Sequence, residues 1–423
     1  MIKRSFFSLN QPRLSYDLLE PDLKEPEVIP IPASLSLLLP EAIDSTKQAL
    51  IKKGDAVKKG EKLTLYHDST AYTISPVAGT IHLFDSYSDD FGNVATFIII
   101  KPDLSKSSGD GTVILDPVEE IGFADQFLQK LPGAPPFGLL ANDDIKINTI
   151  VITCADTDLL STTSQYVGIK YPEEIKEGAN ILKRMTRVAK FCITLPEDLK
   201  TQVSFDSIQV LKTSNAYPAT LPAMIMKNHL NMVLPAGKMP YDMGICFVRA
   251  EALVSLARVY KTKAAVFDKI FTLIGKDGTR HRVRATIGTP LSKVFSRFGI
   301  HINEQDRIII GGPMRGFATF THHHPVLPDM DTVIVQDRDI IPHLSDTPCV
   351  NCGKCIRICP ANIPVNMLVR YLEADQYEEA ADRFDLGSCI ECGLCAYVCT
   401  ARIPLYQYIR LGKHELLTLR ANA

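Results

Sequence analysis

The sequence predicts a multidomain chain of mixed α/β and β fold class that ends in a helical unit rich in cysteine. Short strands broken by Gly-Asp and Gly-Glu turns fill residues 50–82, a pattern typical of a small β-barrel. Strand and helix patterns alternate from about residue 145 to residue 262, as expected of a βαβ-type, Rossmann-like α/β domain. Near the C-terminus, two identical cysteine patterns flank a stretch with apolar residues at helical intervals.

Length and composition are those of an ordinary globular protein. The 423 residues correspond to roughly two to four domains, and 46 Lys and Arg residues nearly balance 48 Asp and Glu residues. A net charge of −2 gives no overall field that would attract nucleic acid, so we expect no nucleic-acid partner. The longest apolar stretches, Leu37–Pro40 and Phe97–Ile100, fall far short of the roughly 18 residues that cross a bilayer. We therefore expect a soluble or peripheral chain with no transmembrane segment of its own.

Residues 1–115 are expected to form an N-terminal segment and the barrel. The run Leu50–Leu63 and the segment Ser75–Ile81 resemble lipoyl and biotinyl carrier domains. Carriers display a modified lysine at a hairpin tip before the second segment, whereas residues 68–72 here read Asp-Ser-Thr-Ala-Tyr. We therefore expect a carrier-like barrel without a prosthetic arm and with a structural or interfacial role.

Strand and helix signals predict the two middle units. Within residues 116–262, Thr149–Cys154 and Val188–Leu195 are β-rich apolar runs, and Pro172–Arg187 opens with Pro-Glu-Glu, a good helix start. Residues 263–325 carry two short strands around a Lys-Asp-Gly-Thr turn, followed by a helical pattern. This third unit is therefore predicted to be a small β-grasp-like domain.

Eight of the eleven cysteines form a repeat in the C-terminal unit, residues 326–423. The first pattern is C-x2-C-x2-C-x3-C, made by Cys349, Cys352, Cys355 and Cys359. The same spacing recurs 40 residues later in Cys389, Cys392, Cys395 and Cys399. Three thiolates spaced by two residues can wrap one [4Fe-4S] cubane, and Gly353 and Gly393 relieve crowding where the chain approaches the inorganic sulfurs. The repeat therefore predicts two [4Fe-4S] clusters and an electron-transfer role.

Each motif is expected to share its ligands with the other, because in two-cluster ferredoxins the fourth cysteine serves the other cluster. We assign one cluster to Cys349, Cys352, Cys355 and Cys399, and the other to Cys389, Cys392, Cys395 and Cys359. Structural zinc sites are the alternative interpretation, but such a site needs only four ligands in two separated pairs. Between the motifs, Val365–Ala374 and Tyr377–Phe384 predict two short helices, which resembles the helical two-cluster modules of membrane-associated redox enzymes.

Three cysteines and a histidine run outside the repeat are not expected to bind metal. Cys154, Cys192 and Cys246 lie in apolar, strand-like surroundings and are interpreted as buried thiols. His322–His324 are consecutive and cannot all face one ion, so we expect a solvated loop. Arg315 stands in a glycine-rich loop, where we expect a surface salt bridge, with anion binding as the alternative.

The order of the four units resembles that of RnfC, the peripheral subunit of the Rnf ion-pumping ferredoxin:NAD oxidoreductase. The specific matches are Pro235–Gly244, the glycine-rich run Gly311–Gly316 and the tail Cys399–Leu405. The resemblance implies a flavin- and NADH-binding α/β domain, a soluble-ligand-binding β-grasp domain and a helical two-cluster ferredoxin domain. It also implies partners among the other subunits of a membrane-bound complex, and a peripheral location on the cytoplasmic face of the bacterial inner membrane.

Three departures affect the nucleotide site that the resemblance implies. The family's G-x-G-G-A-G-F-P-T stretch, which lets backbone approach a flavin phosphate and a nicotinamide nucleotide, corresponds to Leu131–Gly138, whose prolines offer no N–H. The family's E-x-E-P element is replaced by shorter carboxylates at Asp156 and Asp158, and its Y-P-x-G-G-E element by Tyr217–Pro222. FMN and NADH stay open as cofactors, and we expect their site to be degenerate.

These observations lead to one preferred function and two alternatives. The preferred hypothesis is an RnfC-like subunit that relays electrons through two clusters in a membrane-bound respiratory complex. The first alternative is an NADH-oxidising, FMN-dependent dehydrogenase subunit of that complex, and the second is a docking scaffold with structural clusters. No catalytic side chain is assigned, because the redox chemistry belongs to the clusters.

Overall fold

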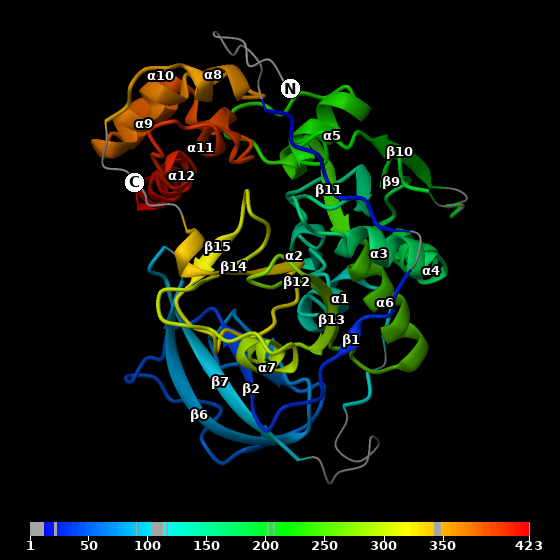
Figure 1. Cartoon of the computed structure of the whole chain (residues 1–423). Coiled ribbons are helices and arrows are strands. Elements are labelled where there is room, and N and C mark those ends of the chain that lie inside the picture. The colour runs from blue at the N-terminus through cyan, green and yellow to red at the C-terminus, as the bar shows by residue number, and fades with distance from the viewer. Residues whose placement is uncertain are drawn as a thin grey trace.

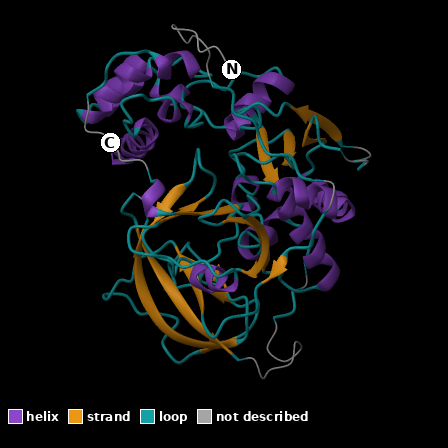
Figure 2. Cartoon of the chain, viewed as in Figure 1, coloured by secondary structure: helices purple, strands orange, loops and turns teal. Residues whose placement is uncertain are grey.

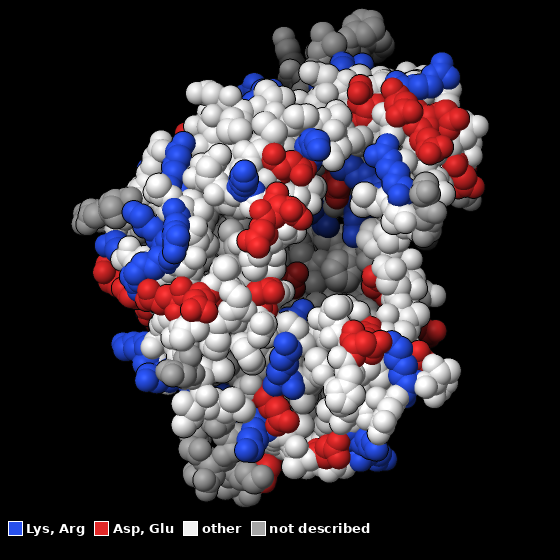
Figure 3. Space-filling model, turned by 180° about the vertical axis from the view of Figure 1, so that it is seen from behind, with Lys and Arg blue, Asp and Glu red and all other residues white. Residues whose placement is uncertain are grey.

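The computed structural model describes residues 12–20, 23–89, 91–103, 113–115, 117–200, 203–205, 208–341 and 348–422. A strand-rich part lies at one end of the molecule, and an α/β part and a C-terminal helical part lie side by side at the other end (Figures 1 and 2). Acidic and basic side chains are interspersed over the face seen in Figure 3, in keeping with the small net charge.

The N-terminal part is a β half-barrel. A four-stranded antiparallel sheet has the order β2-β7-β6-β3, and a two-stranded sheet pairs β4 with β5. The bounds are β2 Leu35–Leu39, β3 Ala56–Val57, β4 Lys62–Leu63, β5 Thr73–Ile74, β6 Gly79–Ser88 and β7 Val94–Pro102. Paired residues Leu37 and Ile98 are both buried in its aliphatic core. Residues 68–72, at the place of the carriers' lysine, are tied to the barrel by a hydrogen bond from Ser69 Oγ to Glu41 Oε2 (2.7 Å).

The second part is a parallel sheet with helices on both faces. Its order is β10-β9-β8-β11, so the chain builds outward on one side of β8 and then crosses to the other side. The strands are β8 Thr149–Thr153, β9 Lys190–Pro196, β10 Gln209–Thr213 and β11 Ile245–Arg249. The helices are α1 Ile121–Phe127, α2 Phe137–Leu140, α3 Thr163–Lys170, α4 Pro172–Thr186, α5 Pro222–His229, the 3-10 helix η1 Pro240–Met243 and α6 Ala250–Thr262. Ile150 and Ile152 face the core with α3, α4 and α6, whereas Val151 faces the core with α5. The predicted helix start at Pro172 is confirmed.

The third part is a six-stranded mixed sheet that draws strands from distant parts of the chain. Its order is β1-β13-β12-β16-β14-β15. The bounds are β1 Glu27–Val28, β12 Asp268–Ile274, β13 Arg280–Thr286, helix α7 Leu291–Arg297, β14 Arg307–Ile310, β15 Phe317–Thr319 and β16 Thr332–Gln336. The predicted strand-turn-strand unit is the β12–β13 hairpin, and α7 packs on the sheet through Leu291 and Phe295. Strands β1 and β16 each pair in parallel with one strand of that hairpin.

The C-terminal part is helical and carries the cysteine repeat. Its elements are α8 Lys354–Ile358, α9 Val365–Glu373, α10 Tyr377–Phe384, α11 Leu394–Tyr397 and α12 Leu405–Asn422, with short 3-10 helices at η2 Arg338–Ile340 and η3 Leu386–Ser388. Helices α9 and α10 are the two predicted linker helices. They pack with α12 around Leu368, Leu372 and Ile409. Across the described residues, no helix is both long enough and apolar enough to cross a membrane.

Buried charges join the α/β part to the six-stranded sheet. Lys269 of β12 is fully buried and pairs with Glu251 and with Asp331 (Nζ to Oδ1, 3.1 Å). Arg249, at the end of β11, completes the network through Asp331 (Nε to Oδ2, 3.1 Å). Each buried charge thus has an opposite partner, and the network spans the two sheets.

One sequence-based expectation is wrong where the half-barrel meets the six-stranded sheet. His322 and His323 are exposed, as expected of a solvated loop, but His324 is buried. Its ring lies edge-on to that of Tyr87, with 5.8 Å between centroids, and its Nδ1 lies 2.9 Å from the Pro325 carbonyl oxygen. Burial lowers the pKa of His324 to about 4, so the ring is neutral at pH 7.

Candidate iron–sulfur cluster sites

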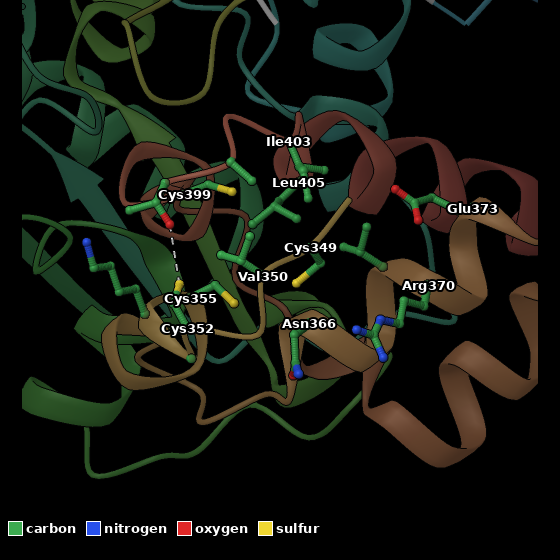
Figure 4. A pocket seen from close by; sticks show the side chains of 15 residues that line it. Cys349, Val350, Cys352, Cys355, Asn366, Arg370, Glu373, Cys399, Ile403 and Leu405 are labelled. Atoms are coloured by element: carbon green, nitrogen blue, oxygen red, sulfur yellow. Dashed lines mark hydrogen bonds between the residues drawn. The ribbon is translucent and has the colours of Figure 1, made fainter. Parts of the chain in front are cut away.

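One cavity lies among α8, α9 and the segment after α11 (Figure 4). Its four cysteines, three from the first motif and one from the second, are Cys349, Cys352, Cys355 and Cys399. Ile403 and Leu405 provide apolar wall, and Asn366 and Arg370 add polar groups. The Thr400 hydroxyl lies 3.5 Å from the Sγ atom of Cys352.

A second cavity is lined by the other four cysteines. They are Cys359, Cys389, Cys392 and Cys395. Ile363, Tyr406 and Ile409 make much of the remaining wall. Helices α8 and α11 lie against each other, and Cys359 and Cys399, which follow them, each line the cavity of the opposite motif.

Gly353 and Gly393 precede the two short helices in left-handed backbone conformations, with φ of 68° and 73°. A Cβ at Gly393 would lie 2.3 Å from the Met314 carbonyl oxygen, so this glycine also permits close packing against a distant loop. At Gly353 the nearest atom would be Nη1 of the flexible Arg357 side chain, at 3.0 Å. The two glycines are equivalent in the sequence repeat, yet only Gly393 is enclosed by backbone of another part.

The thiols differ in how readily they ionise. Burial raises the pKa of Cys392 to about 12 and also raises that of Cys395. The pKa of Cys352 is lowered by the Lys354 backbone N–H and by the Thr400 hydroxyl, which both stabilise its thiolate. Because thiolates are the ligands of iron, cluster insertion must displace protons from the buried thiols.

The donor set fits iron–sulfur clusters. Each cavity presents four soft sulfur donors, one from a short helix and three from the adjoining loops, and has a largely apolar wall, as cysteine-held cubanes require. In the part of the chain that the structure describes, no group of three or more His, Cys, Asp or Glu side chains converges on a single metal ion.

The second cavity lies against the α/β part and the loop before β15. The Tyr217 hydroxyl donates a hydrogen bond to the Cys392 carbonyl oxygen (2.6 Å). Arg315 was expected in a surface salt bridge, but it is half-buried and its Nε donates to the Glu391 carbonyl oxygen (3.2 Å). Met314 is buried in the same apolar cluster as Cys392. Sequence reasoning missed these contacts, because their partners lie 76 to 175 positions apart.

Side chains from the segments that follow β8 and β10 pack with the N-terminal segment in one buried cluster. The rings of Tyr16 and Tyr217 lie 5.3 Å apart between centroids, buried in one cluster with Leu159 and Leu221. The N-terminal segment is held there by the backbone, since the Tyr217 N–H donates to the Leu14 carbonyl oxygen (2.9 Å). This segment therefore lies against the residues that follow β10.

Asp156 and Asp158, the carboxylates singled out in the sequence, are both buried and accept hydrogen bonds from other groups of the protein. Asp156 accepts a hydrogen bond from Ser161 Oγ (2.8 Å). Asp158 accepts from the backbone N–H groups of Met314 (3.2 Å) and Arg315 (2.8 Å). Burial raises the pKa of Asp158 to about 6, against the lowering effect of these donors. Asp158 thereby ties the α/β part to the loop that contacts the second cavity.

The loop 131–138, which corresponds to the family's glycine-rich stretch, is packed into the protein. The backbone N–H groups of Gly133, Ala134 and Phe137 all donate to protein carbonyls. A Cβ at Gly133 would lie 2.3 Å from the Ala252 backbone nitrogen, and Pro135 and Pro136 line a small pocket together with residues of α6. These amides are therefore occupied by protein acceptors.

Comparison with known proteins defines the class first. Residues 348–403 match the family model of the 4Fe-4S dicluster domain. Fold and site thus define an iron–sulfur protein with two [4Fe-4S] clusters, which confirms the prediction from the cysteine repeat.

The relatives define the family more closely. The chain is 28% identical over 391 residues to the C subunit of the ion-translocating oxidoreductase complex of Edwardsiella ictaluri, and 26% identical over 377 residues to that of Vibrio cholerae. These alignments cover 83% of this chain but 47% and 48% of the relatives, so the chain spans about half their length. Identity is 24% over 417 residues to the C subunit of the proton-translocating ferredoxin:NAD(+) oxidoreductase complex of Clostridium ljungdahlii, covering 92% and 89% of the two chains. The chain is a distant homologue of the C subunits of Rnf-type complexes.

Among solved structures, an NAD+-reducing [NiFe]-hydrogenase in the H2-reduced state aligns with a TM-score of 0.40 and 14% identity, over 66% of this chain and 56% of that chain.

Proposed function

We propose that this chain is an RnfC-like electron-transfer subunit that relays single electrons through two clusters within a membrane-bound respiratory complex. The observation that carries the proposal is the pair of four-cysteine cavities joined by α8 and α11 in one helical domain. Clusters ligated in this way carry electrons without a catalytic side chain. Distant homology to the C subunits of ion-translocating complexes supports the same function.

The ligation that we propose is crossed between the motifs. One cluster is held by Cys349, Cys352, Cys355 and Cys399, and the other by Cys389, Cys392, Cys395 and Cys359. The support is the composition of the two cavities, each of which takes three cysteines from one motif and the last cysteine from the other.

The four proposed units are a carrier-like barrel in residues 1–115, a Rossmann-like α/β domain in 116–262, a β-grasp-like domain in 263–325 and a helical ferredoxin domain in 326–423. The strand order of the parallel sheet is that of the first four strands of the doubly wound fold, which supports the second unit. The β12–β13 hairpin packed by α7 supports the third. Strand β16, which follows residue 325, belongs to the same sheet.

We also propose that the chain has lost the FMN and NADH site that its relatives' family implies. A flavin phosphate needs several free backbone N–H donors, whereas three amides of the loop 131–138 already have protein acceptors. Asp156 and Asp158, which stand where the family has its acidic flavin element, are buried and accept hydrogen bonds from protein groups. Electrons then enter and leave through protein partners rather than through NADH.

The partners that we propose are the other subunits of a membrane-bound Rnf-like complex. We place the chain peripherally on the cytoplasmic face of the bacterial inner membrane. The relatives' names, which describe subunits of ion-translocating oxidoreductase complexes, support partnership with other subunits of such a complex.

The test is a reduction experiment on anaerobically purified protein with both clusters loaded. NADH should leave the cluster absorbance unchanged, whereas reduced methyl viologen should bleach it and produce paramagnetic signals from both clusters. Reduction by NADH together with retained flavin would establish the FMN-dependent dehydrogenase instead. Clusters that no reductant can reduce would establish a structural role.

A further inference from the structure

Two cations from distant parts of the chain donate hydrogen bonds to the loop 389–392, which carries two cysteines of the second cluster site. Lys413 of α12 donates from Nζ to the Cys389 carbonyl oxygen (2.7 Å). Arg315, in the loop before β15, donates from Nε to the Glu391 carbonyl oxygen (3.2 Å). Both side chains are half-buried. Two positive charges are therefore held at hydrogen-bond distance from the backbone of the ligand loop.

The second cavity itself offers these cations no counterpart of like charge. Apart from its four cysteines, the described residues that line it are apolar or uncharged, and they include Tyr406 and Ile409 of α12. One carboxylate lies beside the ligand loop, because Glu391 Oε1 accepts from Lys413 Nζ (2.7 Å), in an ion pair whose side chains are 33% and 25% exposed. Glu391 therefore offsets part of the Lys413 charge. Since water reaches this pair only in part, it is screened less than charges on the open surface.

The first cluster site has its cations in solvent. Lys354 and Arg370 line its cavity, and both side chains are exposed. Arg357 donates to the Cys352 carbonyl oxygen (3.1 Å) and is exposed as well. Exposed charges interact weakly, because water and salt screen them. The fixed charges of the protein therefore act more strongly on the second site than on the first.

Reduction of a cluster changes its charge. One electron passes from a donor, which is oxidised, to the cluster, and no bond forms or breaks. The cluster with its thiolates becomes more negative by one charge, so a nearby cation stabilises the reduced form and a nearby carboxylate destabilises it. Reduction potentials of clusters accordingly depend on the net charge, hydrogen bonds and solvent exposure around them. Charges beside the ligand loop can therefore set the potential without binding the cluster.

We propose that Lys413 and Arg315 set the reduction potential of the cluster led by Cys389, raising it through positive charge held at its ligand loop, and that Glu391 limits this effect. The inference rests on the proposed electron-transfer function. Arg315 belongs to the loop that Asp158 holds to the α/β part. The potential of the second cluster consequently depends on the contact between the α/β part and the helical domain.

The experiment is a redox titration of the full chain with both clusters loaded, in which paramagnetic resonance measures each cluster at each potential. The signal that Cys395→Ala removes identifies the second cluster, and the first cluster is the internal reference. The test variants are Lys413→Gln, Arg315→Gln and Glu391→Gln, which remove one charge each and retain a polar side chain. Lys413→Arg keeps the positive charge. The control is Arg420→Gln, which removes an exposed cation of the same helix outside both cavities.

We expect Lys413→Gln and Arg315→Gln each to lower the equilibrium constant for reduction of the second cluster about ten-fold, which corresponds to a midpoint potential about 59 mV lower for one electron. Glu391→Gln should raise that constant by a similar factor, because it leaves the Lys413 charge without its carboxylate. Lys413→Arg and Arg420→Gln should leave the midpoint where it is in the unmodified chain. The first cluster should keep its midpoint in every variant.

A merely structural role for these side chains gives a different result. The variants would then lose iron or stability, while the second clusters that remain would keep the original midpoint. Fully loaded variants with that unchanged midpoint would overturn the proposal, as would a shift in the same direction for Lys413→Gln and Glu391→Gln. If Lys413→Gln fails to retain iron, Glu391→Gln decides, because its predicted shift has the opposite sign.

Reduction with methyl viologen separates this inference from the function on which it rests. Clusters that the reduced dye cannot reduce would refute the electron-transfer function, and the inference with it. Clusters that the dye reduces, with a second midpoint that ignores all three charges, would refute only the role of these side chains.

Discussion

Replacement of Gly393 by alanine should loosen the contact between the second cluster site and the α/β part. The residue has φ of 73°, and alanine in that conformation costs about 1 kcal/mol relative to glycine. The added Cβ would also lie 2.3 Å from the Met314 carbonyl oxygen, an overlap that backbone must relieve by moving. Overpacking of this kind costs about 1–3 kcal/mol in addition. The total loss of stability at this contact is then about 2–4 kcal/mol.

Hydrogen exchange measures this loss where it occurs. The backbone N–H groups of Met314 and Arg315 donate to Asp158 only while the loop keeps its place against Gly393. A loss of about 2–4 kcal/mol should accelerate their exchange by roughly 30-fold to 1,000-fold, since about 1.4 kcal/mol corresponds to a factor of ten. Peptides from the half-barrel should exchange as before.

Gly353→Ala is the matched control for this variant. Gly353 has nearly the same φ, 68°, but its added Cβ would meet only the end of the Arg357 side chain. It should therefore carry the conformational cost of about 1 kcal/mol without the packing cost. Equal exchange rates of the Met314 and Arg315 amides in the two variants would refute the argument that Gly393 is required by this contact.

Three other measurements test the site. Anaerobic purification should yield about eight iron and eight acid-labile sulfide per chain, whereas stoichiometric zinc without sulfide would contradict the clusters. Cys359→Ala should disturb the paramagnetic signal of the cluster led by Cys389, and Cys399→Ala that of the cluster led by Cys349; the reverse result would show uncrossed ligation. Because burial raises the pKa of Asp158 to about 6 from its ordinary 3.8, the native state holds this proton more tightly than the unfolded state between those pH values. Its contribution to the free energy of unfolding should fall as the pH rises through that window. Urea unfolding should accordingly show that the free energy of unfolding of the unmodified chain, relative to that of Asp158→Asn, is larger at pH 5 than at pH 7. The same difference at both pH values would contradict this prediction.

The N-terminal segment packs where the α/β part meets the helical domain. Tyr16 packs on Tyr217, and the hydroxyl of Tyr217 reaches the backbone of the second cluster site. The segment after β10 thus contacts the helical domain directly.

Sequence alone determined the features of this protein that depend on residues close together in the chain. The spacing of the cysteines predicted both clusters, because three ligands two residues apart reach one cubane from a single turn of backbone. Apolar residues at helical intervals predicted α9 and α10, and Pro172 with its two glutamates predicted the start of α4. Departures from the family motif marked the loop 131–138 as altered without showing what its amides contact.

Only the tertiary structure decided which distant segments meet. Glu27 of β1 pairs with Val283 of β13, far along the chain, and a strand as short as β1 carries too little pattern to identify its partner. The burial of His324 depends on Tyr87, and that of Tyr16 on Tyr217, so neither follows from the residues beside them. Gly353 and Gly393 occupy equivalent positions in the repeat, yet only the folded chain brings a carbonyl oxygen against one of them. Local spacing specifies ligands and helices, whereas long-range contacts are specified by how the whole chain buries its apolar surface and pairs its polar groups.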